Sequence, residues 1–225
     1  MSINITIPSG MENKLGDGRG MVWTPVIEDE GLENAFVVGP MQENLKNGDI
    51  NKVPIMIGFN SEEELHFFRD DIPALIKFLS DEAFTTPLTR HAELQSNYTD
   101  VYLYQFSYKG AIGSGSVTVK DVETVGHFEE LHYMWDFHDI VNETSVRDTL
   151  MHHRLLKLWT NFVKYLNPTP SEDVLLNGVI WPKVSPTNIT YYDINTAIEV
   201  RTDPRRYKDW KPIIEKYAIP PLANY

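Results

Sequence analysis

The apolar residues of the chain gather in short runs that alternate with stretches of helical periodicity. Residues 53–58 form a short apolar run that ends at a glycine, which is typical of a buried parallel strand with both faces covered. Residues 101–108 are rich in aromatic and β-branched side chains and predict a second strand. Two shorter strands are predicted late in the chain, at 189–194 and 197–201.

The clearest helical pattern covers residues 150–166, where apolar side chains such as Leu155 and Leu158 recur at three- and four-residue spacing. Ser61 followed by Glu64 matches a capping box, so a helix is also expected directly after the first strand, as far as residue 68. Shorter helices are predicted at 42–46, 72–79, 128–137 and 206–217.

The predicted strands and helices interleave along the chain, and this order indicates the α/β class. The sequence contains no repeat array, no low-complexity tract and no evident linker. We therefore expect one domain over residues 1–225, in which residues 1–20, with their Gly and Asn punctuation, are irregular.

The composition excludes several classes of protein. Apolar residues make up 42% of the chain, which is typical of a globular protein, and the formal net charge of -12 argues against nucleic-acid binding. No apolar run approaches the roughly 18–20 residues of a membrane span. The absence of cysteine excludes a disulfide scaffold, a thiolate metal site and a cysteine nucleophile.

Four N-x-[ST] sequons give a weak indication of a secretory relative. The first twenty residues contain no apolar core of the kind found in signal peptides, so no signal peptide is predicted. The sequon asparagines, which are candidate glycosylation sites, are Asn4, Asn97, Asn142 and Asn188.

Two residues that could carry chemistry follow the two clearest strands. Glu63 lies just beyond the end of the first predicted strand, and His127 follows the second by a loop. Functional groups gather at the carboxyl ends of strands in open α/β sheets, and a carboxylate beside an imidazole fixes its tautomer and stabilises its charged form. Taken singly, three adjacent glutamates also suit a solvated helix N-terminus, and one histidine among seven also suits a structural role.

A metal site is a competing interpretation of the same residues. Glu63 with His66 and Glu129 with His132 form two Glu-x-x-His pairs, a spacing that occurs in di-iron four-helix bundles. That fold needs four long helices, whereas strands alternate with short helices here. We therefore predict no metal ion at these residues.

Taken together, the motifs resemble the type-B carboxylesterases, in particular the insect members, over most of the chain. Residues 54–63 resemble the family pattern P-x-x-x-G-x-N-x-x-E, and residues 126–131 resemble G-H-x-D-E-L. Further likeness lies at 23–28, 101–108, 159–170, 181–182 and 191–194.

The resemblance implies an α/β-hydrolase fold and the hydrolysis of a carboxylic ester by a catalytic serine. It implies that Glu63 is the acid of the catalytic triad, His127 its histidine and Glu130 a nearby supporting acid. It also implies a small-molecule ester as the partner, no cofactor, and a secreted or extracellular location for a full-length relative.

The sequence also departs from the family pattern. It contains neither a G-x-S-x-G nucleophile elbow nor an HGG-type oxyanion loop. Glu64, Thr124 and Leu166 stand where the family usually has glycine, and the helical lid before the D-x-x-F-x-x-P motif at 81–87 is short. We therefore expect an incomplete α/β-hydrolase fold, comprising the C-terminal half of a mixed, mostly parallel sheet with flanking helices, and no activity by itself. The alternative is a non-catalytic, cholinesterase-like adhesion module.

Overall fold

The computed structural model describes residues 27–66, 73–113, 119, 125–135 and 145–217. The chain divides into two compact units, Met1–Pro40 and Met41–Tyr225. In the described part of the first unit, the carboxylate of Glu28 accepts hydrogen bonds from the backbone N–H groups of Phe36 (2.5 Å) and Val37 (2.8 Å), which closes a loop. The helices and strands described below all belong to the second unit.

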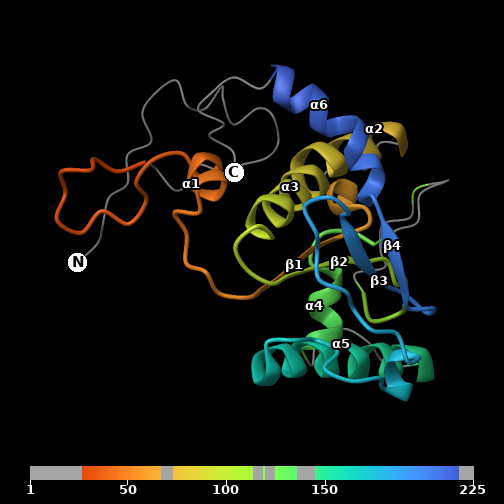
Figure 1. Cartoon of the computed structure of the whole chain (residues 1–225). Coiled ribbons are helices and arrows are strands. Elements are labelled where there is room, and N and C mark those ends of the chain that lie inside the picture. Colours follow the sequence, from red (N-terminus) through yellow and green to blue (C-terminus); the bar gives the residue numbers. More distant parts are fainter. Residues whose placement is uncertain (1–26, 67–72, 114–118, 120–124, 136–144, 218–225) are drawn as a thin grey trace, which may run out of the picture. The chain divides into compact units, whose positions relative to one another are not determined.

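Four strands of the second unit form one sheet in the order β1-β2-β3-β4 (Figure 1). They are β1 (Ile55–Asn60), β2 (Val101–Phe106), β3 (Thr190–Ile194) and β4 (Glu199–Thr202). β1 and β3 both run parallel to β2, whereas β4 runs antiparallel to β3. The antiparallel pairing follows from the short connection between β3 and β4, because a parallel pair needs a long crossover. All four predicted strands, and the mixed, mostly parallel sheet, are confirmed.

Helices cover both faces of the sheet because successive side chains of β2 point to opposite sides. Val101 and Leu103 pack with Ala92 in one core cluster, and Tyr102 and Phe106 pack in a second cluster with Leu155. The helices are α1 (Met41–Asn47), α2 (Pro73–Ser80), α3 (Thr86–Gln95), α4 (Glu129–Met134), α5 (Val146–Tyr165) and α6 (Tyr207–Tyr217). Ala92 belongs to α3 and Leu155 to α5, so these two helices lie on opposite faces (Figure 1).

The sequence pattern did not predict α3 or the π-helical turn Asp81–Thr85 that precedes it. The reason is that this helix buries polar side chains, among them Thr89 (0% exposed) and Arg90 (7%), so apolar periodicity is weak. Pro87 near its first turn is consistent with a helix start, since proline lacks an N–H that would be unsatisfied there.

The predicted capping box at Ser61 is wrong. Ser61 donates its N–H to the carbonyl of Phe106 (3.0 Å) and so continues the β1–β2 pairing. Its Oγ has no hydrogen-bond partner in the described part of the chain, and the N–H of Glu64 donates to Ser80 Oγ (3.1 Å). In place of the expected helix, the described residues form a short 3-10 helix, Glu63–His66.

The predicted long helix is α5, which starts four residues earlier than expected because its first turn is mostly exposed and polar. Ser145 caps it by accepting the N–H of Asp148 (3.1 Å). Leu166, which stands in place of a family glycine, has φ +55° at the C-terminal cap. The helix therefore ends with the left-handed conformation that glycine usually supplies, and a leucine adopts it.

Gly58 of β1 lies directly opposite Tyr104 of β2, so close that a Cβ atom there would overlap the Tyr104 ring. We expect Gly58→Ala to lower the free energy of unfolding by about 1–3 kcal/mol, because the strands would have to shift. Chemical denaturation measures this loss. The double variant Gly58→Ala/Tyr104→Leu should recover part of it. If Gly58→Ala costs as much in a Tyr104→Leu protein as in the unchanged protein, the packing argument is contradicted.

Several predictions concern residues outside the described part of the chain. These include the irregular N-terminal segment 1–20, the last two residues of the helices predicted to end at 68 and at 137, the first residue of the helix predicted at 72–79, and the sequons at Asn4 and Asn142. Asn97, just after α3, and Asn188, in the turn before β3, are both exposed. Glycosylation at these two positions stays a prediction.

Candidate active site

The candidate acid, Glu63, lies in a tight turn at the carboxyl end of β1. Its Oε1 accepts the backbone N–H of Asn60 at 2.7 Å, so the side chain folds back onto the end of its own strand. The N–H of Glu62 donates to the carbonyl of Val125 (2.9 Å), two residues before His127. The turn is thus joined to the segment that carries His127, and Glu63 is only 5% exposed.

The candidate base, His127, contacts Glu63 directly. Its Nδ1 lies 2.6 Å from Glu63 Oε2, although the two residues are 64 positions apart in sequence. A carboxylate can only accept, so Nδ1 is the donor and Nε2 of the neutral ring carries the lone pair. The His127 side chain is 26% exposed, and within the described residues it makes no second hydrogen bond. Nε2 is therefore the ring nitrogen that can accept a proton from a reacting group.

Glu130 joins the pair through Asn60. The side-chain amide of Asn60 donates to Glu130 Oε2 (2.5 Å) and to the carbonyl of Gly126 (2.8 Å). Burial raises the pKa of the Glu130 carboxyl, and the nearby charge of Glu63 raises it further, while the Asn60 hydrogen bond opposes both. The structure therefore brings Glu63, His127 and Glu130 into one cluster.

Asn60 is a further candidate site residue, which the sequence motifs did not single out. It belongs to the P-x-x-x-G-x-N-x-x-E pattern at residues 54–63. Its backbone N–H donates to Glu63 and its side chain donates to Glu130 and Gly126, so one residue holds both carboxyl groups and the turn before His127. The one signal for it in the sequence is an asparagine, whose side chain carries two N–H donors, two residues after a predicted strand.

The surroundings favour the protonated form of His127. The Glu63 hydrogen bond raises the pKa of His127 most, burial lowers it, and the charges of Glu63, Glu130 and Glu64 raise it. We expect the pKa of His127 to lie above its ordinary value of 6.5. Because the folded-state pKa is raised, the stability from the charged pair is fully present below the unfolded pKa and is lost as the pH rises through the folded pKa.

NMR titration of the histidine Cε1 protons measures this, with His127→Asn used for assignment. Glu63→Gln should lower the pKa of His127. His91 serves as an internal control, because burial lowers its pKa while its hydrogen bond to Gln95 (2.7 Å) only partly opposes this. A His127 pKa below that of His91 would contradict the electrostatic picture.

Two phenylalanines flank the His127 ring. The ring centroid of Phe84 lies 5.1 Å from that of His127, and the centroid of Phe128 lies 3.8 Å from it. Phe128 is 58% exposed and has φ +69° at the start of α4. The His127 ring thus contacts two aromatic side chains.

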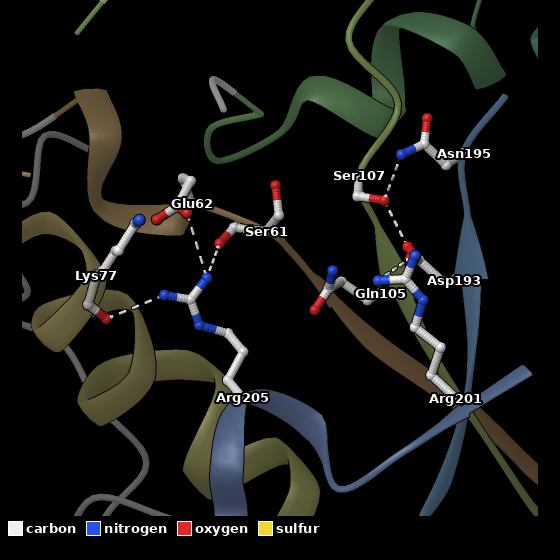
Figure 2. Close-up of a pocket in the computed structure, with 9 residues that line it drawn as sticks. All are labelled: Ser61, Glu62, Lys77, Gln105, Ser107, Asp193, Asn195, Arg201 and Arg205. Atoms are coloured by element: carbon white, nitrogen blue, oxygen red, sulfur yellow. Dashed lines mark hydrogen bonds and ion pairs between the residues drawn. The ribbon is translucent and has the colours of Figure 1, made fainter. Parts of the chain in front are cut away.

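A polar pocket of about 520 Å³ lies beside the acid turn (Figure 2). Arg205 donates to the carbonyl of Ser61 (2.5 Å) and to Glu62 Oε1 (3.3 Å), and it also pairs with Asp81. Burial raises the pKa of both Glu62 and Asp81, and Arg205 opposes the rise. The pocket is lined by Ser61, Glu62, Lys77, Gln105, Ser107, Asp193, Asn195, Arg201 and Arg205.

The lining does not include Glu63 or His127, so the pocket and the candidate acid-base pair are distinct. On its far side, Arg201 pairs with Asp193 (3.1 Å), which also accepts a hydrogen bond from Ser107 (Figure 2). Paired charges therefore line the pocket: Arg205 joins the acid turn to the segment after β4, and Arg201 joins β4 to β3.

The model of the carboxylesterase family matches residues 68–210. This chain belongs to the carboxylesterase family. A juvenile hormone esterase of Tribolium castaneum is 27% identical over 133 residues, which are 55% of this chain and 22% of that protein.

Solved structures share the fold of this carboxylesterase-family chain. Juvenile hormone esterase from Manduca sexta, with OTFP covalently attached, matches with a TM-score of 0.65 and 21% identity over 87% of this chain and 47% of that one. A PNB esterase matches with a TM-score of 0.60 and 19% identity over 76% of this chain and 40% of that one. The chain thus spans less than half the length of these relatives, and its fold is an incomplete α/β-hydrolase fold.

Within the described residues, Glu63 and Glu129 do not lie on the long helices that the metal interpretation requires. Glu63 begins a 3-10 helix and Glu129 begins the six-residue helix α4, both beside a mixed sheet. Among the residues that the structure describes, no group of three or more His, Cys, Asp or Glu is placed to hold a metal ion. No helix in the same part of the chain is long and apolar enough to cross a membrane.

Proposed function

We propose that this chain supplies the acid and the histidine of the catalytic triad of a serine carboxylic-ester hydrolase. The observation that carries the proposal is the 2.6 Å contact between Glu63 Oε2 and His127 Nδ1 at the carboxyl ends of two adjacent parallel strands. In α/β enzymes this edge of the sheet is where functional groups meet. The membership in the carboxylesterase family supports the same reaction class.

In this reaction His127 Nε2 accepts the proton of a serine hydroxyl while the serine oxygen attacks the ester carbonyl carbon. The tetrahedral intermediate collapses as His127 returns that proton to the leaving alcohol, which gives an acyl-enzyme. Water then attacks the acyl-enzyme by the same proton transfers and releases the carboxylic acid. Glu63 holds the ring in the correct tautomer and stabilises its charged form throughout.

The serine and the oxyanion donors must come from polypeptide other than the 225 residues of this sequence, which contain no G-x-S-x-G elbow and no HGG loop. We propose that the free edge of β1 receives further strands of the same sheet, since β1 pairs only with β2 within the described residues. By itself the chain is then inactive, because no acyl-enzyme forms without the nucleophile.

The substrate class that we propose is a carboxylic ester with an apolar group. Phe84 and the exposed ring of Phe128 border His127 and would contact such a group. Two relatives carry the name juvenile hormone esterase, so juvenile hormone belongs in the first substrate panel beside p-nitrophenyl esters of increasing chain length.

Fluorophosphonate labelling tests the proposal, because such a probe reacts with an activated serine. The 225-residue chain and the longest protein encoded by its transcript are treated in parallel and assayed with the ester panel. We expect labelling and turnover in the longer protein and neither in the chain by itself. A longer protein with another residue in place of the elbow serine, and no labelling, would overturn the proposal in favour of an adhesion module.

A further inference from the structure

A buried carboxylate lies outside the Glu63–His127 pair. Asp148, in the first turn of α5, is 1% exposed. Its Oδ1 accepts hydrogen bonds from the hydroxyls of Tyr108 (3.1 Å) and Tyr133 (3.3 Å) and from the N–H of Ala111 (3.2 Å), and its Oδ2 accepts the hydroxyl of Ser145 (2.6 Å). A buried carboxylate with this many donors is well compensated for the loss of water.

The donors come from both sides of the segment that carries His127. Tyr108 and Ala111 belong to the loop that leaves β2, upstream of His127, and Tyr133 belongs to α4, directly downstream. The two sides also touch each other, because the N–H of Gly113 donates to the Tyr133 hydroxyl (3.3 Å). Asp148 therefore joins the two ends of the segment to α5.

The backbone packs closely against this cluster at two glycines. A Cβ atom at Gly110 would overlap Asp148 Oδ1, and one at Gly113 would overlap a carboxylate oxygen of Glu129. Burial raises the pKa of Tyr108 to about 12, with the Asp148 charge adding to the rise, so its hydroxyl stays a donor at any physiological pH. Helices α4 and α5 are also joined by the contact of His152 Nδ1 with the carbonyl of Tyr133 (2.6 Å).

Few hydrogen bonds within the described residues hold the His127 side chain in place. Glu63 is its one hydrogen-bond partner within the described residues, and the next residue, Phe128, has a left-handed backbone (φ +69°). A phenylalanine adopts this conformation only where the surroundings enforce it. His127 directly precedes Phe128, the N-cap of α4, so the position of this helix, which begins at Glu129 and carries Glu130, constrains where His127 lies.

We propose that Asp148 is a positioning residue, which holds the loop after β2 and helix α4 so that His127 meets Glu63. The inference rests on the proposed function, in which these two residues form the acid-histidine pair. It extends that function to α5, the helix that carries Asp148.

The test compares two buried polar residues of the same helix in the full chain. Asp148→Asn removes the carboxylate charge that accepts hydrogen bonds from the loop after β2 and from α4. Arg154→Lys is the matched control, because Arg154 (5% exposed) donates to the carbonyls of Leu175 and Thr196 and to Asn177, away from the His127 segment. The readouts are the thermal midpoint and the pKa of His127 by NMR.

We expect both variants to lower the thermal midpoint, and Asp148→Asn alone to lower the His127 pKa as well. Tyr133→Phe removes a single hydroxyl and should lower the His127 pKa by a smaller amount, which keeps the test decisive if Asp148→Asn does not fold. Asp148→Glu, which keeps the carboxylate, should leave the His127 pKa closer to that of the unchanged protein than Asp148→Asn does. An unchanged His127 pKa in Tyr133→Phe and in folded Asp148→Asn would overturn the inference.

The same spectra separate this inference from the proposed function. If Glu63→Gln lowers the His127 pKa but the Asp148 and Tyr133 variants do not, the pair stands and the positioning role fails. If Glu63→Gln also leaves the His127 pKa unchanged, the pair itself fails.

Discussion

His127→Asn in the longest protein encoded by the transcript should reduce kcat for ester hydrolysis by about 10⁴-fold or more, because the serine would lose its general base. Glu63→Gln should cost about 10⁴-fold, since a neutral amide favours the wrong tautomer of the imidazole. In both cases KM should change far less than kcat, because neither side chain is needed to bind the substrate. Steady-state assays with a p-nitrophenyl ester measure both parameters.

The matched control is His91→Asn, which removes another half-buried histidine that pairs with Gln95 on α3 and does not contact Glu63. It should retain activity within a few-fold. A loss of less than tenfold for His127→Asn would show that another residue is the base and would remove His127 from the proposed mechanism.

Leu155→Ala should lower the free energy of unfolding of the chain by about 2–5 kcal/mol. Leu155 is 0% exposed and lies in the core cluster with Tyr102 and Phe106 of β2, so its removal leaves a cavity between α5 and the sheet. Urea denaturation followed by circular dichroism measures the loss. A large loss is expected because Leu155 is fully buried where the longest helix packs on the sheet.

Leu156, the next residue on the same helix, gives the control. It is 36% exposed, so Leu156→Ala removes the same atoms from a partly solvated position and should cost at most about 1 kcal/mol. Equal losses for the two variants would mean that α5 does not pack on the sheet through Leu155. The pair also calibrates the Asp148 and Arg154 variants, which lie on the same helix.

The two predictions separate stability from chemistry. Leu155 lies in the core between the sheet and α5, whereas His127 meets Glu63 beyond the ends of the strands. A destabilised Leu155→Ala protein that still folds at low temperature should keep the raised His127 pKa. The His127→Asn protein should keep most of its stability while its activity is lost.

The sequence by itself determined the strands and the longest helix. Residues 53–58 and 101–108 are apolar on both faces because helices cover both sides of the sheet, and α5 shows its period because one face packs on that sheet. Local patterns suffice where burial repeats with the period of the element. The sequence also indicated the motifs around Glu63 and His127, since each follows a predicted strand.

Only the tertiary structure decided the remainder, because it depends on contacts between distant residues. α3 escaped detection since its buried side chains are polar and find their partners elsewhere, as Arg90 does with Gln42 (3.3 Å). The Ser61 cap failed because Ser61 continues the pairing with β2. The role of Asn60 and the cluster around Asp148 arise from hydrogen bonds that span up to 70 residues, and no local pattern encodes a partner at that distance.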